Sequence, residues 1–484
     1  MKLINKLESK LLLCLLILIS SCTDILDLKP VSTITNSSFW NTEDDANGAI
    51  SGMYVYLRNL ASQNLFIWGE ARSEVMEWSG LSGTADFDRY YNNTLSAQLS
   101  GPDWLSLYTT VNAANLIIRH VPDIDIPTEE SKNNILAQAY TTRAYLYFVM
   151  ARTWGGVPIR TEPTEGYNSE TTQKSRSTIE EVFKLIKEDL DLAISLFEDN
   201  TFFAGRNRWS RPAANALKAE VYLWTGKQLN GGNADFTIAL EACNEVQKAD
   251  LELLPNFADL FEYSNKRNKE VIMAVAFDAI ESGRNVYYSM YSGLTSSSTD
   301  PINGEIIGRS SDGLVWTVTQ LVRDQFTADD KRRDPSFAVV PNYSILVRKC
   351  RGIMISGVRY FTSDIALYRY ADVLLMMAEA KNALGLDPSA EINTIRKRAY
   401  GDAFNSHVYI NNGTKEQNDN AILKERLLEL VFEGKRWWDL VRFEKAFDLV
   451  PSLSERAGQD YLLKWPIGLT TLSLEPQIQQ NPGW

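Results

Sequence analysis

The chain has 484 residues, a net charge of -12, and 12 tryptophan, 21 tyrosine and 19 phenylalanine residues. This length suffices for one large domain or two closely packed ones, and the aromatic side chains supply ample material for a core. The acidic charge argues against nucleic acid, or any polyanion held by bulk attraction, as the partner, although a local basic patch could bind an acidic sugar.

The first residues have the pattern of a bacterial lipoprotein signal. Three lysines within the first ten residues precede an apolar run at 11–19, and a Ser-Ser pair stands directly before Cys22. The run is shorter than the roughly 20 apolar residues that span a bilayer. We therefore expect a signal peptide at 1–21, acylation of Cys22 and a lipidated tether at 22–42, with an ordinary secreted protein as the alternative.

Cysteine usage predicts that no disulfide framework holds the fold. Once the leader is removed and Cys22 is acylated, Cys243 and Cys350 remain, far apart in sequence. They could pair in an oxidising compartment, but two buried free thiols are the favoured interpretation.

Apolar residues recur at helical spacing through most of the chain after residue 43. The predicted helices cover 103–120, 128–151, 178–194, 213–224, 364–384, 421–432 and 435–447. Thr178 and Glu181 form a capping-box signature, and Gly226 is expected to end its helix. Small residues (Ala144, Ala219, Ala378) stand where paired helices would approach closely, as in degenerate tetratricopeptide-like repeats.

Two segments depart from this helical pattern, at about 79–100 and 276–362. They are rich in Gly, Ser, Tyr and Asn, and the short alternating runs at 270–276 and 343–348 suggest strands or loops. The expected fold is thus mainly α: a tetratricopeptide-like helical-hairpin frame over 43–484, with an inserted irregular lobe of loops and short strands. Loops on a rigid frame are where function usually lies.

Seven motifs lie in one order along the chain. They are CTDILD (22–27); FW followed by EDD (39–45); RAYLY running into WGGVP (143–158); AEVYLWTG (219–226); YRYADVLL (368–375); ER with FEGKRWWDL (425–440); and QNPGW (480–484). Together they resemble the SusD/RagB family of outer-membrane glycan-binding lipoproteins of the Bacteroidetes. The resemblance implies a protein anchored through Cys22 on the extracellular face of the outer membrane, which captures oligosaccharide and delivers it, as a lid, to a SusC-like TonB-dependent transporter. It also implies no covalent chemistry and no cofactor.

The aromatic motifs themselves are expected in the core. Trp437 and Trp438 would point about 100° apart on a helix, so at least one of them should be buried. Aromatic stripes on amphipathic helices, such as those at 145–147 and 368–370, usually pack internally. The motifs that mark the family therefore say little about the ligand.

A glycan site needs flat aromatic faces for sugar carbons and planar polar groups for hydroxyls. The irregular segments contain both, and Arg72 and Trp78 lie where the family often has binding residues. The predicted stacking residues are Trp78, Tyr91, Tyr288, Tyr291 and Trp316, and the predicted hydrogen-bonding residues are Arg72, Asn92 and Asn285. We expect micromolar to millimolar affinity, about -8 to -4 kcal/mol, because the cargo must be released.

Three alternatives remain open from the sequence. A peptide-binding lid or a protein-interaction scaffold of the same family would use the same frame. A helical-barrel glycosidase would need two carboxylates about 5 to 9.5 Å apart across a cleft. The two histidines, His120 and His407, have no metal-ligand spacing, and no metal site is predicted, although the acidic loops leave calcium open.

Overall fold

A computed structural model describes residues 39–79, 87–166, 173–280, 283–291, 299–307, 315–340, 344–411 and 413–484. Most of these residues lie in helices. The longer ones are α3 (Glu43–Ala61), α6 (Leu105–His120), α7 (Glu129–Trp154), α9 (Ile179–Leu196), α10 (Arg211–Gln228), α11 (Gly232–Val246), α15 (Tyr370–Ala383), α16 (Ser389–Tyr400) and α17 (Lys415–Leu430). The shorter ones are α4 (Asn64–Gly69), α5 (Asp88–Tyr91), α12 (Tyr288–Tyr291), α13 (Gln320–Arg323), α14 (Arg333–Ser336), α18 (Arg436–Arg442), α19 (Ala446–Leu449) and α20 (Leu469–Leu474).

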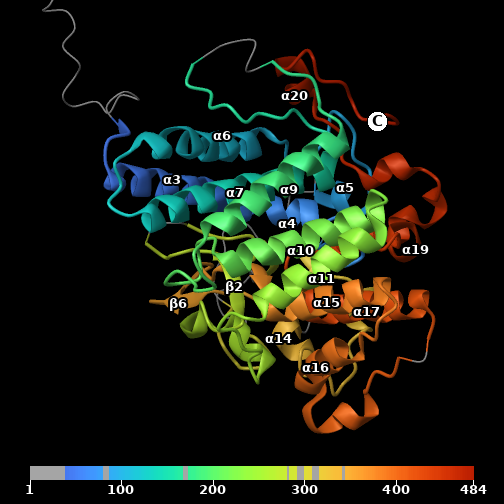
Figure 1. Cartoon of the computed structure of the whole chain (residues 1–484). Helices are drawn as coiled ribbons and strands as arrows, with labels where there is room; N and C mark the ends of the chain where they lie inside the picture. The colour runs from blue at the N-terminus through green and yellow to red at the C-terminus, as the bar shows by residue number, and fades with distance from the viewer. Residues whose placement is uncertain are drawn as a thin grey trace, which may run out of the picture.

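The longer helices pack as successive hairpins. From top to bottom Figure 1 shows α6, α3 and α7, then α10 and α11, then α15 with α17 and α16. The tightest pairs are α10 with α11 and α7 with α9. Ala144, Ala219 and Ala378 are fully buried, as expected for residues between closely packed helices. The predicted mainly α frame is confirmed.

Threonine side chains begin four of the longer helices. Thr42, Thr128, Thr178 and Thr414 each accept a hydrogen bond from the backbone N–H three residues on. In α3, α9 and α17 that third residue also bonds back to the cap, which completes a capping box. The capping box predicted at Thr178 is therefore confirmed.

Gly226 lies within α10 and does not end it, contrary to the prediction. A Cβ at this position would collide with the ring of Phe236 on α11. The missing side chain lets the two helices approach, and α10 continues to Gln228.

The single helix predicted at 364–384 is a strand followed by a helix. β8 (Ile365–Arg369) pairs antiparallel with β2 (Val271–Val275), and α15 begins at Tyr370. Arg369 is extended, with φ -137° and ψ 161°, and its buried side chain donates to Glu270 and Glu433. Pairing with a distant strand outweighed the local helical pattern, as it commonly does.

The helix predicted at 435–447 is also divided, into α18 and α19. Glu444 has a left-handed backbone, with φ 58°. The N–H groups of Glu444 and Lys445 return to the carbonyls of Val441 and Leu440 at 3.1 and 2.8 Å. These bonds close the end of α18, so the chain turns before α19 begins.

The strands form two-stranded antiparallel ladders. Besides β2 with β8, the described pairs are β1 (Met76–Trp78) with β3 (Trp316–Val318), β4 (Phe337–Val340) with β5 (Ser344–Val347), and β6 (Ile353–Ile355) with β7 (Val358–Tyr360). The runs at 270–276 and 343–348, for which strands or loops were expected, contain the strands β2 and β5.

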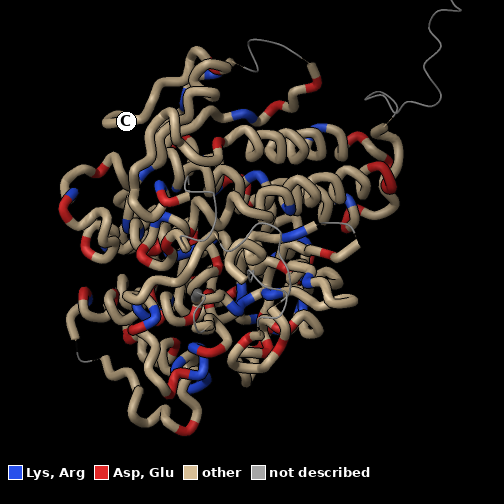
Figure 2. The backbone as a smooth tube through the Cα atoms, turned by 180° about the vertical axis from the view of Figure 1, so that it is seen from behind, with Lys and Arg blue, Asp and Glu red and all other residues tan. Residues whose placement is uncertain are grey.

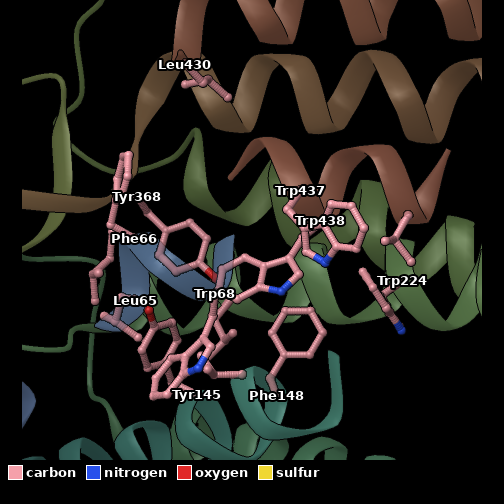
Figure 3. Packing of buried hydrophobic residues seen from close by; sticks show 14 of the residues in the cluster. Leu65, Phe66, Trp68, Tyr145, Phe148, Trp224, Tyr368, Leu430, Trp437 and Trp438 are labelled. Atoms are coloured by element: carbon pink, nitrogen blue, oxygen red, sulfur yellow. The ribbon is translucent and has the colours of Figure 1, made fainter. Parts of the chain in front are cut away.

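The main core is rich in aromatic rings drawn from distant parts of the chain. Figure 3 shows Trp437 and Trp438 of α18 above Phe148 of α7, with Trp68 and Tyr145 close by. Trp437 is 0% and Trp438 4% exposed, so the predicted core role of this pair is confirmed. Tyr145, Tyr147 and Tyr368 are buried as well, while Tyr370 is partly exposed.

Buried charges join the C-terminal helices to the strands. Glu429 on α17 accepts hydrogen bonds from Arg369 at 2.6 Å, from Arg332 at 3.4 Å and from Arg398. Burial opposes ionisation of Glu429, but attraction to the three guanidinium groups outweighs it and lowers its pKa to about 2. Figure 2 shows acidic and basic positions lying side by side in the lower half of the molecule.

Cys243 and Cys350 are free and buried, which confirms the favoured interpretation of the cysteines. Burial raises the pKa of the Cys350 thiol to about 12. Among the helices that the structure describes, none has the length and apolarity needed to cross a bilayer. Cys22 and the predicted signal peptide lie outside the described residues.

Candidate functional site

Two segments that the sequence analysis selected for ligand binding meet at a short β-ladder. β1 pairs with β3, and Trp78 lies directly opposite Trp316. The N–H of Val315 donates to the carbonyl of Ser289 at 2.9 Å, which attaches α12 to the same ladder. The candidates at 72–92 and 285–316 therefore come together although they are distant in sequence.

Four of the eight candidate residues are partly exposed around this ladder: Trp78, Tyr91, Asn92 and Tyr288. The guanidinium of Arg284 lies 3.6 Å from the ring centroid of Tyr288. The indole N–H of Trp78 is buried and has no acceptor among the described residues. Partly exposed aromatic faces and an amide are groups with which proteins bind sugars, whereas the buried indole N–H is not accessible to a ligand.

Two predicted stacking rings belong to the core, contrary to the prediction. Trp316 is 2% exposed and packs against Phe66 and Phe87, with ring centroids 5.6 and 5.1 Å away. Tyr291 is 0% exposed and donates to Asp300 at 3.2 Å, and burial raises its pKa. Their burial leaves neither ring open to a ligand.

Two predicted hydrogen-bonding side chains are likewise buried and already paired. Arg72 donates to Asn93 at 2.8 Å and to two backbone carbonyls of the C-terminal segment, and its guanidinium lies 4.3 Å from a ring centroid of Trp437. Burial lowers the pKa of Arg72 to about 9. Asn285 donates to the carbonyl of Ser363 at 2.9 Å. Both side chains hold loops in place and do not face solvent.

A cavity of about 390 Å³ lies near the ladder, and none of the eight predicted site residues lines it. Phe87 lines it and meets Trp316 edge-on, and Arg89 lines it as well. Its polar wall contains residues that the sequence analysis did not select: Gln63, Asn64, Gln98, Ser100, Asp103 and Thr470. The neighbouring amides of Gln63, between α3 and α4, and Asn64, at the start of α4, were a usable sequence signal. The position of Thr470 beside them depends on the tertiary fold and could not be predicted from sequence. The volume lies within the range of small-ligand sites.

Comparison with known proteins identifies the family. A family pattern described as "Starch-binding associating with outer membrane" matches residues 24–223, and that of the SusD family matches 340–484. A solved SusD superfamily protein from Bacteroides vulgatus is 32% identical and superposes with a TM-score of 0.80, covering 92% of this chain and 100% of that one. The chain belongs to the SusD family.

Two further solved structures place this SusD-family chain among proteins of similar architecture. NanU of B. fragilis is 32% identical, with a TM-score of 0.82, and the match covers 94% of this chain and 100% of that one. A laminarin-binding SusD-like protein is 25% identical, with a TM-score of 0.75, and the match covers 92% of this chain and 100% of that one. The resemblance stated from the seven motifs is confirmed.

Proposed function

We propose that this SusD-family protein captures an oligosaccharide at the cell surface and performs no covalent chemistry on it. The observation that carries the proposal is the β1–β3 ladder, which unites two distant loop segments and leaves Trp78, Tyr91, Asn92 and Tyr288 partly exposed. The starch-binding description of the matching family and the laminarin-binding relative support a glycan as the ligand.

The exposed groups suit a glycan better than a charged metabolite. Sugar carbons bury apolar area against rings such as Trp78 and Tyr288, at about 25 cal/mol per Å². The partly exposed amide of Asn92 provides hydrogen bonds to hydroxyl groups. A few such contacts correspond to micromolar to millimolar affinity, about -8 to -4 kcal/mol, which permits release.

The proposal extends to the partner and the location. The protein, anchored by lipid through Cys22, lies on the extracellular face of the outer membrane as the lid of a SusC-like TonB-dependent transporter. The family description "associating with outer membrane" supports the location. Anchoring beside the transporter raises the local concentration of the captured glycan, which compensates for modest affinity.

A glycan-array screen of the chain from residue 23 onward tests the proposal, because this chain contains every described residue. We expect binding to one glycan class, with Tyr288→Ala weakening it at least about tenfold, or 1.4 kcal/mol. Tyr360→Ala, at an exposed ring of β7, is the control and should bind as the wild type does. A blank array with folded protein would favour peptide cargo or a scaffold, and sustained release of sugar products would indicate an enzyme.

A further inference from the structure

A second cavity, of about 380 Å³, is lined by three arginines. Arg58 of α3, Arg208 and Arg267 contribute to its wall, together with Asn207 and Asp278. It shares no lining residue with the cavity near the β1–β3 ladder. We call it the arginine recess.

Two arginines of the arginine recess, Arg208 and Arg267, keep donor groups that no described residue uses. Arg267 pairs through Nε with Asp364 at 3.0 Å, but Lys266 pairs with the same carboxylate at 2.9 Å. Among the described residues, Arg208 makes no hydrogen bond or ion pair, and the terminal nitrogens of Arg267 make none either. These donor groups remain available to an anion in a chain whose net charge is -12.

Contacts within the protein fix two residues of the recess wall, Arg267 and Tyr54, without a ligand. Gly205 has φ +87°, and its missing side chain leaves room for Arg267, whose Cδ and Nη1 lie 3.4 and 3.5 Å from the ideal Cβ position. Tyr54, another lining residue, accepts from the N–H of Trp209 at 2.8 Å and donates to Gln138 at 3.0 Å. Groups fixed in this way lose little conformational freedom on binding.

We propose that the arginine recess binds the carboxylate or sulfate group of an acidic saccharide, at a site separate from the β1–β3 ladder. A guanidinium with free terminal N–H groups forms paired hydrogen bonds to such planar or tetrahedral anions. Arg208 and Arg267 supply these groups, and Asn207 adds a polar residue to the same cavity wall. The recess would select charged sugars, whereas the ladder offers no such concentration of cations.

Calorimetric titration with three probes tests the site: trigalacturonic acid, its fully methyl-esterified form and a sulfated chondroitin disaccharide. We expect at least one acidic probe to bind and the neutral ester not to bind. Affinity should fall several-fold between about 0.01 M and about 0.15 M salt, because the recess is open to solvent. Binding of only the carboxylated or only the sulfated probe would name the anion, and either result supports the site.

Variants link the binding to the recess. Arg208→Gln should weaken the acidic probe at least about fivefold, and the double variant Arg208→Gln with Arg267→Gln at least about tenfold. Asp278→Asn should strengthen it, since it removes an opposing charge. Lys397→Gln, an exposed position on α16, is the matched control and should leave affinity unchanged.

Three results would overturn the assignment: no binding of either acidic probe, equal binding of the methyl ester, or wild-type affinity in the folded Arg208→Gln protein. Circular dichroism and a thermal melt verify folding, and the single variant decides if the double one does not fold. Tyr288→Ala should not alter binding of the acidic probes. Failure of the proposed ladder site is therefore distinguishable from failure of this one.

Discussion

Trp78 and Trp316 face each other across the β1–β3 ladder, yet only Trp78 is partly exposed, while Trp316 is 2% exposed. Phe66 and Phe87 cover Trp316, with ring centroids 5.6 and 5.1 Å away. The inner tryptophan anchors the ladder in the core, and the outer one lies at the surface. Two residues that the sequence could not distinguish therefore have different expected effects when they are replaced.

Trp78→Ala should weaken glycan binding at least about tenfold and leave the free energy of unfolding within about 1 kcal/mol of wild type. Trp316→Ala should lower the free energy of unfolding by about 3–5 kcal/mol, because it leaves a cavity between Phe66 and Phe87. Urea unfolding and calorimetric titration of the same preparations measure both effects. Equal loss of stability in the two variants would contradict the assigned roles.

Arg72→Ala should destabilise the protein and not act on the ligand alone. Its guanidinium bonds to Asn93 and to two backbone carbonyls in a buried position, so removal leaves those acceptors unpaired at a cost of about 3 kcal/mol or more. A thermal melt or urea titration measures the loss. Asn92→Ala, at the partly exposed end of α5, is the comparison and should lower glycan affinity while stability is retained.

Gly226→Ala should lower the free energy of unfolding by about 1–3 kcal/mol, because the added methyl group would force the ring of Phe236 and α11 away from α10. Gly52 offers a matched control. It also lies within a helix, α3, but a Cβ there would have no neighbour within 4 Å. Gly52→Ala should therefore stabilise the protein by up to about 1 kcal/mol. Destabilisation by both substitutions would show that helix packing is not the cause.

Glu429 should make stability depend on pH below pH 5. Its pKa is about 2 in the folded protein, below its ordinary value of 4.5, so the unfolded chain binds more protons between these two values. The contribution of Glu429, about 3 kcal/mol, is present above pH 4.5 and lost as the pH falls toward 2.

Urea unfolding at pH 7, 5 and 3 measures this dependence. Glu429→Gln should be less stable at pH 7, because it leaves three buried arginines short of a partner, and its stability should fall less from pH 5 to pH 3. Glu416→Gln, at an exposed position near the start of α17, should retain the wild-type slope. Parallel pH curves for wild type and Glu429→Gln would contradict the assignment.

Local patterns predicted the helical frame well. The cap at Thr178 depends on residues within one helical turn, which the sequence shows directly. The burial of the alanines at 144, 219 and 378 follows from their small side chains, which the sequence also shows. Prediction failed where a distant partner competed. β8 resembles the first turns of α15 until its pairing with β2 is known, and Gly226 resembles a helix end until Phe236 is seen beside it.

The sequence by itself determined the family, the mainly α frame and the core role of Trp437 and Trp438. It also predicted a ligand site in two segments, which the β1–β3 ladder brings together. Only the tertiary structure decided which side chains in those segments are exposed, because the burial of a residue depends on which distant parts of the chain pack against it. Trp316 and Arg72 have the same side-chain chemistry as a ligand-binding tryptophan and arginine. Phe87 packs against Trp316, however, and the C-terminal segment accepts the hydrogen bonds of Arg72. Arg58, Arg208 and Arg267 form a recess for the same reason, because the folded chain brings three unremarkable surface arginines to one cavity.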